Sequence, residues 1–293
     1  MQRQPFIIHA LSPLHAGTGQ ASDLIDLPIA RMQSTGIPFV PGSSIKGVLR
    51  DSQRNANGTL AEEALGIFGP ETDSAGDHAG ALTCGDARLL ALPVRSFKGA
   101  FAWVTSPLLL TLAARDMDIS PPALVDFHGR GARVTEGSAN VHRHQGKDYL
   151  YLEDYDLPAH KKPFPAELEP VFRQVFAGDD QWAMFRSRCA ILDDETMAYL
   201  WEMATQIDTR VRINPETRTV AAGALWTEES LPPETLLIGV MSADRVRRPG
   251  CQMTPEDVLN RVLSQERVLQ IGGKAAVGRG LSRLVPIRKG DGK

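Results

Sequence analysis

Apolar residues along the chain fall into short runs that predict both strands and helices. Residues 6–11 and 86–94 are almost continuously apolar, which is typical of buried strands. Residues 106–115 begin with Ser-Pro and continue with leucines, which predicts a helix with proline at its first position. The same criteria predict further strands at 101–104 and 235–243, and helices at 193–206 and 254–268.

These elements follow one another irregularly, which suits an α+β fold better than a doubly wound parallel sheet. Residues 127–150 are rich in Gly, Arg and His and show weak periodicity, so we expect a long, irregular insertion there. No low-complexity tract, clear linker or short-period repeat divides the chain. Residues 1–293 are therefore expected to form one elaborated domain.

The composition argues against several classes of protein. Hydrophobic residues make up 42% of the 293 residues, and no apolar run approaches the roughly 20 residues that span a membrane. The N-terminus lacks the features of a secretory signal, so a cytoplasmic protein is expected. Cys84, Cys189 and Cys251 form no CxxC pair, which argues against a zinc ribbon or a disulfide framework. The net charge of -3 argues against a uniformly basic nucleic-acid binder but allows a local basic groove.

The segment after the first predicted strand combines glycines with carboxylates. Gly17 and Gly19 could bring backbone N–H groups close to a phosphate. Asp23 and Asp26 lie three residues apart, and a carboxylate beside such a loop could hold a divalent metal or orient an attacking hydroxyl. A carboxylate in a turn near the end of a strand explains the same pattern. Spacing alone therefore leaves both interpretations open.

Residues 41–54 predict a helix with a basic face. Ser43 or Ser44 can cap this helix, and its first N–H groups can bind an anion. Lys46 and Arg50 are four residues apart and share a face, so they form either a phosphate-binding edge or a solvated basic surface. The segment also fits the S-x-x-K step of serine acyl-transfer enzymes, but the companion SDN and KTG motifs are absent.

Residues 209–221 predict a basic β-hairpin. Arg210 and Arg212 alternate with apolar residues as far as Ile213, the sequence Asn-Pro-Glu-Thr forms a turn, and Arg218 lies on the return strand. Apolar side chains on such a hairpin could wedge between the bases of an RNA. A plain surface hairpin is the alternative interpretation.

Residues 271–280 hold four glycines and two cations. They lack the order of a Walker A loop and of a dinucleotide-binding fingerprint. A Gly-rich loop with two cations fits a polyanion that lies across backbone amides. The residues that would take part are Gly272, Gly273, Lys274, Gly278 and Arg279.

The order of these segments resembles that of the RAMP superfamily. The chain contains, in sequence, HAGTG, IDLP, PGSSIKG, GDARLLALPVRSFKG with TSP, RIN with GALW and paired Glu, and finally IGG with VGRG. The resemblance runs from about residue 8 to residue 282. PGSSIKG and the terminal glycines are shared across the superfamily, whereas IDLP and LLALPVRSFKG point to the backbone subunit of the type III-B CRISPR (Cmr) effector complex.

The resemblance implies a modified RRM-like (ferredoxin-like) core with long insertions and a projecting hairpin, the thumb. Several copies would stack in a helical filament along a guide RNA, beside other Cmr subunits, and would cleave complementary single-stranded target RNA at regular intervals. Asp26 matches the carboxylate on which cleavage depends and would hold part of a divalent metal, Mg2+ or Mn2+. His15 and Glu228 match residues near the scissile site, as candidate proton-transfer or orienting groups.

The alternative is a non-catalytic RNA-binding scaffold of a CRISPR ribonucleoprotein, in which Asp26 would be dispensable. In both cases the segments above and the resemblance together predict one set of RNA-binding residues. These are Gly17, Gly19, Ser43, Ser44, Lys46, Arg50, Arg210, Arg212, Ile213, Arg218, Gly272, Gly273, Lys274, Gly278 and Arg279.

Overall fold

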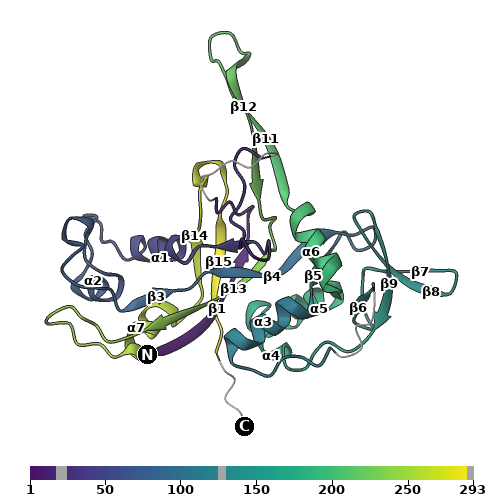
Figure 1. The fold of residues 1–293 in the computed structure, drawn as a ribbon, viewed down its shortest axis with the longest axis horizontal. Coiled ribbons are helices and arrows are strands. Elements are labelled where there is room, and N and C mark those ends of the chain that lie inside the picture. The colour runs from purple at the N-terminus through teal and green to yellow at the C-terminus, as the bar shows by residue number, and fades with distance from the viewer. Residues whose placement is uncertain (18–24, 125–129, 289–293) are drawn as a thin grey trace.

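The body of the molecule is built on one large mixed sheet (Figure 1). The structure is a computed structural model that describes residues 1–17, 25–124 and 130–288. In spatial order the strands are β14 (Arg267–Gln270), β15 (Leu281–Pro286), β1 (Gln2–Ala10), β13 (Leu236–Ala243), β4 (Ala87–Arg95), β5 (Phe101–Thr105), β10 (Cys189–Leu192), β6 (Ala132–Val134), β9 (Tyr155–Lys161), β8 (Lys147–Leu152) and β7 (Val141–His144). Two short strands lie off this path, β2 (Phe39–Val40) beside β4 and β3 (Leu82–Cys84) beside β13.

Helices cover both sides of the sheet. They are α1 (Gly42–Asp51), α2 (Glu62–Phe68), α3 (Pro107–Met117), α4 (Glu169–Val175), α5 (Asp179–Arg188), α6 (Asp194–Met203) and α7 (Pro255–Leu263). Most neighbouring strands are antiparallel, while β5 with β10 and β6 with β9 are parallel. The predicted α+β class with an RRM-like core is confirmed. None of the helices in the described ranges is long and apolar enough to cross a membrane.

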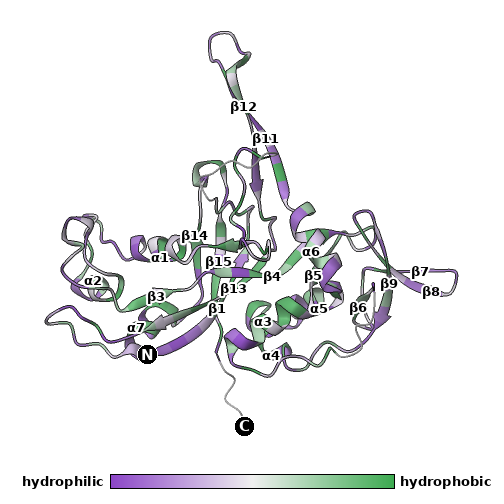
Figure 2. Cartoon of the chain, viewed as in Figure 1, coloured by the Kyte–Doolittle hydropathy of each residue, from purple (hydrophilic) through white to green (hydrophobic). Residues whose placement is uncertain are grey.

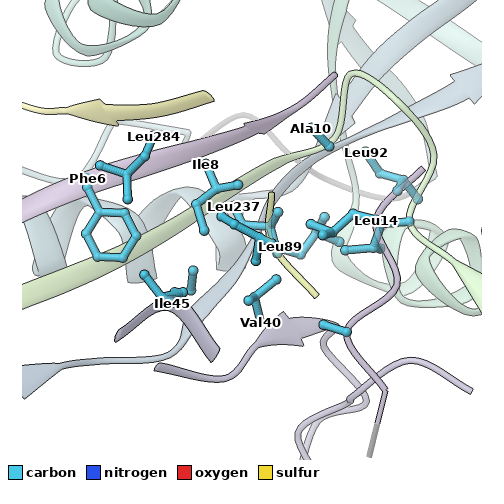
Figure 3. Close-up of a cluster of buried hydrophobic side chains, with 14 of the residues drawn as sticks. Phe6, Ile8, Ala10, Leu14, Val40, Ile45, Leu89, Leu92, Leu237 and Leu284 are labelled. Carbon is cyan, nitrogen blue, oxygen red and sulfur yellow. The ribbon is translucent and has the colours of Figure 1, made fainter. Parts of the chain in front are cut away.

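The apolar runs of β1 and β4 reflect burial on both faces of the sheet. Phe6 and Ile8 of β1 pack into one cluster with Ile45 of α1 and residues of α2 and α7, as Figure 3 shows in part. Ile7, on the opposite face, packs into a second cluster with residues of α4 and α5. A strand buried on both faces shows no alternation of polar and apolar residues, which explains the continuous run. Figure 2 shows the same concentration of hydrophobic residues in β4 and α3.

A separate two-stranded hairpin projects from this body (Figure 1). It consists of β11 (Gln206–Ile213) and β12 (Val220–Ser230). The predicted hairpin is therefore present, but its strands extend well beyond 209–221. Its register shifts between Val211 and Ile213, and Gly223 in the opposite strand has a φ of 67°. Glycine accommodates this left-handed conformation without strain.

The expected irregular insertion at 127–150 is instead largely ordered sheet over residues 130–150, while residues 127–129 lie outside the described residues. Strands β7, β8 and β9 form an antiparallel meander, and β6 joins it to β10. Turns at Gln145-Gly146 and after Leu152 connect strands that are too short and too polar on their outer face to give a clear periodic signal. The helix predicted at 254–268 is also shorter, because Arg267–Gln270 pairs with β15 as β14.

The predicted serine cap of α1 is wrong. The helix begins at Gly42 with Pro41 as its N-cap, and neither serine caps it. The N–H of Gly42 donates instead to Oδ1 of Asp86, at 2.8 Å. A carboxylate already occupies the helix terminus that was expected to bind a phosphate.

The three cysteines are free thiols. Burial raises the pKa of Cys84 and of Cys189 to about 12, so these two thiols stay protonated and unreactive. This agrees with the absence of a CxxC pair in the sequence.

Replacing Gly42 should destabilise the fold, because a Cβ at this position would clash with the backbone of Cys84. We expect Gly42→Ala to cost about 1–3 kcal/mol in free energy of unfolding, measured by urea denaturation. Gly47 of the same helix has open space around it, so Gly47→Ala should instead stabilise the protein by about 0.5–1 kcal/mol. Equal effects of the two substitutions would contradict the close approach of α1 to the strand.

Candidate active site at the base of the hairpin

The segment that carries Asp26 lies against strand β12 at the base of the hairpin. The N–H of Leu27 donates to the carbonyl of Thr227 at 3.1 Å, and the N–H of Glu229 donates to the carbonyl of Leu27 at 3.0 Å. These bonds are the ladder of a short parallel bridge between Leu27 and Glu228. Asp26 is thereby fixed beside the root of the hairpin although it is some 200 residues away in sequence.

The carboxylate of Asp26 is exposed and held by one residue, Thr227. Its Oδ2 accepts hydrogen bonds from the N–H of Thr227 at 2.7 Å and from the Thr227 hydroxyl at 2.9 Å. The N–H and the hydroxyl of Thr227, in that order, hold the pKa of Asp26 below its usual range. Asp26 is therefore an ionised, solvent-facing carboxylate in a defined orientation, which suits binding of a cation or of a hydroxyl.

His15 lies close to the same strand, and one of its ring nitrogens forms a hydrogen bond to it. Its Nδ1 is 2.7 Å from the carbonyl of Glu229, which can only accept, so Nδ1 carries the proton. In the neutral ring, Nε2 is then left with a lone pair and faces Gly17, where an added Cβ would lie 2.8 Å away. The need for glycine at position 17 thus follows from its close approach to His15.

The Gly-rich loop of residues 271–280 packs against the same region. The N–H of Gly273 donates to the carbonyl of His15 at 3.0 Å, and the N–H of Gly280 donates to that of Pro13 at 2.8 Å. Gly272, with a φ of 81°, has its Cα pressed against the backbone of His15. These glycines serve close packing of two loops, whereas Gly278 has open space around it.

The carboxylate of Glu228 is buried, with 3% of the residue exposed, and is held by three side chains. Its Oε1 accepts from Nε1 of Trp226 at 2.7 Å and lies 2.9 Å from Nζ of Lys274, while Oε2 is 3.4 Å from Nε of Arg210. Burial raises the pKa of Glu228, but Trp226 and Lys274 outweigh it and the pKa lies below the usual range. This ionised carboxylate ties the hairpin to the Gly-rich loop.

Asp26 and Glu228 are directed to opposite faces of the hairpin. Successive side chains of a strand alternate between faces, so Thr227, which holds Asp26, and Glu228 point in opposite directions. The structure therefore brings His15, Asp26 and Glu228 to one strand without grouping the two carboxylates. No cluster of three or more His, Cys, Asp or Glu that could hold a metal occurs among the residues described.

Glu229 is a residue of the candidate site that the sequence did not single out. Its Oε2 accepts from the N–H of Ile29 at 3.0 Å, and its Oε1 accepts from Arg31 at 2.5 Å and from the Thr205 hydroxyl at 2.8 Å. Glu229 is buried and so connects the Asp26 segment, the hairpin and the end of α6. The strand alternation around the paired glutamates was the available signal, since it places Glu229 on the same face as Thr227.

The cations predicted to bind RNA differ in how far they are already engaged. Arg279 is buried, 2.5 Å from Oδ2 of Asp208 and 3.3 Å from the hydroxyl of Ser230. Lys46 donates to the carbonyl of Leu82 at 2.8 Å, and burial lowers its pKa. Arg50 binds the carbonyl of Pro70 and the carboxylate of Glu71. These contacts hold the protein's own loops together.

The outer part of the hairpin is exposed. Arg212, Ile213 and Arg218 reach solvent, and neither arginine forms an ion pair within the described part of the chain. Of the helix α1 pair, Ser43 is exposed and Ser44 is partly so. Gly19 and Asp23 lie outside the described residues.

Comparison with known proteins identifies relatives along nearly the whole chain. The sequence model of the RAMP superfamily matches residues 7–283. The chain is 32% identical over 279 residues to the CRISPR system Cmr endoribonuclease Cmr4 of Pyrococcus furiosus, covering 94% of this chain and 93% of the relative. It is 22% identical to the CRISPR system CMR subunit Cmr4 of Saccharolobus solfataricus, covering 96% and 95%.

Solved structures share the fold. Oligomeric Cmr4 from Pyrococcus furiosus superposes with a TM-score of 0.69 at 26% identity, covering 99% of this chain and 100% of that one. A chain of the type III-B Cmr-beta complex bound to cognate target RNA gives a TM-score of 0.73 at 20% identity, covering 98% and 97%. The second similarity shows the fold alone.

Thr227→Val should raise the pKa of Asp26 part of the way to its ordinary value. The substitution removes the hydroxyl but keeps the N–H that donates to Oδ2, and the shape of the side chain is retained. A carbon-detected NMR titration of the Asp26 carboxyl measures the change. Thr209→Val, at the exposed position directly across the hairpin, is the control and should leave the titration unchanged. An unaltered Asp26 titration in Thr227→Val would refute the proposed cause.

Glu228→Gln should destabilise the protein by about 1–3 kcal/mol at neutral pH, since a charged hydrogen-bonding partner of Lys274 and Arg210 is lost. Because folding lowers the pKa of Glu228, its charge stabilises the protein above the ordinary Glu range, and this contribution disappears as the pH falls. The difference in melting temperature between wild type and variant should therefore narrow below about pH 4. A difference that stays constant with pH would contradict this role.

Proposed function

Since this chain belongs to the RAMP superfamily, we propose that it binds a CRISPR guide RNA, assembles with further copies along it and cleaves complementary target RNA. The assembly would be a helical filament within a cytoplasmic type III-B Cmr complex, alongside other Cmr subunits. The 32% identical relative is an endoribonuclease by name, and a related Cmr4 forms oligomers. The chain covers 93% of that first relative, so the similarity extends over the whole catalytic subunit.

The ionised, oriented carboxylate of Asp26 is the observation that carries the catalytic part of this proposal. Asp26 is fixed by two hydrogen bonds from Thr227, and its carboxylate nevertheless remains exposed to solvent, where a ligand can reach it. It lies at the root of a hairpin whose outer part is exposed and basic. An RNA drawn along this hairpin would pass the carboxylate.

The reaction that fits is attack by the ribose 2′-hydroxyl of the target on its own neighbouring phosphate. The O2′–P bond forms and the P–O5′ bond breaks, which leaves a 2′,3′-cyclic phosphate and a 5′-hydroxyl. Aligning the 2′-hydroxyl with the phosphate supplies much of the rate enhancement. A nucleotide splayed out by the hairpin would be free to adopt that alignment. Ile213, exposed near the hairpin tip, would wedge between bases.

Other residues near the base of the hairpin would transfer the proton and position the RNA-binding loop. In the neutral ring, Nε2 of His15 would take the proton of the 2′-hydroxyl, while its Nδ1 stays bound to the carbonyl of Glu229. Glu228 is committed to Trp226, Lys274 and Arg210, so we assign it to positioning the Lys274 loop. The Lys274 ammonium has further N–H donors besides the one that binds Glu228, and its loop would lie along the RNA backbone.

A divalent metal, Mg2+ or Mn2+, fits Asp26 as its only protein ligand within the described ranges. Mg2+ is commonly bound through one or two carboxylates with water and phosphate oxygens completing its shell. The ion would offset charge that grows on the phosphate oxygens. Asp26, being exposed and ionised, offers the single carboxylate that such a site requires.

RNA binding itself would use the groups that the fold leaves accessible. Arg212, Arg218 and Ser43 are exposed, and Gly17 and Gly278 line the loops beside the site. Arg279, Lys46 and Arg50 would act mainly by fixing the loops and the helix that contact RNA. A non-catalytic scaffold would bind RNA through the same surface, so only the chemistry distinguishes the two functions.

Asp26→Asn should abolish cleavage while guide and target binding persist. We expect a rate loss of about 100-fold or more in the complex reconstituted with guide RNA, because the substitution removes the charge and keeps the shape. Asp51→Asn changes an exposed carboxylate away from the site and should cleave normally. The measurement is a gel assay of end-labelled target RNA. Cutting at the same regular positions by the Asp26 variant would show that the catalytic assignment of Asp26 is wrong.

The nucleophile and the metal requirement of cleavage are tested separately. A single 2′-deoxy substitution at each scissile nucleotide should prevent cleavage there, and EDTA should stop all cleavage. Continued cutting of the deoxy target would identify water as the nucleophile, and cutting in EDTA would remove the metal from the mechanism.

A further inference from the structure

The turn between β4 and β5 presents an aromatic side chain to solvent. Phe97 is 81% exposed, more than any other large hydrophobic residue of the described ranges except the terminal Met1. The turn is nevertheless closed tightly, since the N–H of Ser96 donates to the carbonyl of Ala100 at 3.0 Å. The N–H of Phe97 donates to the carbonyl of Tyr151 at 3.1 Å, which fastens the turn to β8.

A second set of hydrogen bonds joins this turn to the start of β7. Nδ2 of Asn140 donates to the carbonyls of Lys98 and Phe101 at 2.8 and 2.9 Å. Nζ of Lys98 donates to the carbonyl of Val141 at 2.8 Å. The exposure of Phe97 is therefore built into a rigid turn, and rigidly presented aromatic residues are typical anchors of binding surfaces.

Phe97 does not stand alone. Its ring lies 6.2 Å from that of His142 and 6.1 Å from that of Tyr151, and these two rings are 5.8 Å apart. His142 and Tyr151 lie on the outward face of the β7–β8 hairpin, while Leu150 and Leu152 on the other face are buried. Three rings from separate elements thus surround one hollow.

Two carboxylates complete this hollow. Glu153 and Asp156 line it together with the three rings, and its volume is about 380 Å³. Both residues are exposed, and neither forms an ion pair with any part of the chain that the structure describes. Glu153 has a φ of 45°, a left-handed backbone conformation that residues other than glycine rarely adopt. We call this set of five residues, Phe97, His142, Tyr151, Glu153 and Asp156, the acidic aromatic socket.

We propose that the acidic aromatic socket receives a lysine or arginine side chain from a second copy of this chain. A cation over an aromatic face is attracted by the ring, and two adjacent carboxylates add charge-assisted hydrogen bonds. Each copy also offers suitable side chains, since Arg212 and Arg218 on the projecting hairpin are exposed and form no ion pair within the described ranges. One of the two would enter the socket of a neighbour, which leaves the other for RNA. The inference rests on the assembly of copies that is part of the proposed function.

The placement of the socket favours a neighbouring copy. In Figure 1 the β7–β8 hairpin and the β11–β12 hairpin lie at different edges of the molecule. Copies that join head to tail need two such different, complementary surfaces, whereas a twofold dimer needs only one. RNA is less suitable, because its phosphates would meet Glu153 and Asp156, although His144 and Lys147 at the tip of the same hairpin are basic.

The first test separates assembly from RNA binding and from cleavage. The double variant Glu153→Gln/Asp156→Asn and the variant Phe97→Ala are compared with Asp154→Asn, which changes a neighbouring exposed carboxylate outside the socket. Sedimentation velocity with a guide RNA long enough for several copies gives the concentration for half assembly. We expect this concentration to rise about tenfold in the socket variants and to stay unchanged in Asp154→Asn. Unchanged assembly of the double variant would refute the proposal.

Two further measurements make the result specific. Affinity for a short RNA that holds one copy should be the same in the wild type and the double variant, and a parallel loss would show that RNA occupies the socket. The Asp26→Asn variant should assemble normally, so failure of the socket is distinguishable from failure of the catalytic proposal.

The occupant is identified by a photoreactive probe. With p-benzoylphenylalanine in place of Phe97, irradiation of the assembled complex should join the socket to a peptide of another copy that contains Lys or Arg. Cross-links to RNA, or to a different subunit, would overturn the assignment.

Discussion

The active-site region depends on one buried carboxylate, that of Glu229. Burying a carboxylate is costly unless its oxygens are satisfied, and here Ile29, Arg31 and Thr205 satisfy them. These partners belong to the segment that carries Asp26 and to the junction of α6 with β11. Movement of any one of these pieces would remove a hydrogen-bond partner from the buried carboxylate, so Glu229 links the candidate site to the base of the hairpin.

The alternation of side chains along β12 then distributes three tasks over three consecutive residues. Thr227 orients Asp26, Glu228 binds Lys274 on the opposite face, and Glu229 holds the segment that carries Asp26. The Asp26 carboxylate and the Gly-rich loop are therefore coupled through the same strand. A change in the register of the hairpin would displace both at once, because every side chain would change face.

Much of the fold could be predicted from the sequence because its signals are local. Continuous apolar runs identified β1 and β4, and the turn at 214–217 identified the hairpin. The sheet at 132–161 escaped prediction because its strands have only three to seven residues and a polar outer face. For the candidate site, the sequence suggested Asp26, but its partner Thr227 and the engagement of Arg279 with Asp208 depend on contacts between distant segments. No spacing rule reveals those contacts.

Several basic side chains of this chain form contacts within the protein, and its net charge is -3. Both facts bear on how the chain would bind RNA. Arg279, Lys46 and Arg50 bind the protein's own oxygens, so these three cations are not free to bind phosphates. Binding to phosphates gains strength with each cation that displaces a counterion, and a single copy would therefore bind RNA weakly. Copies joined side by side multiply these contacts without any new residue. In the proposed function, assembly would thus supply the affinity that a single subunit lacks, and it would confine cleavage to RNA held by the filament.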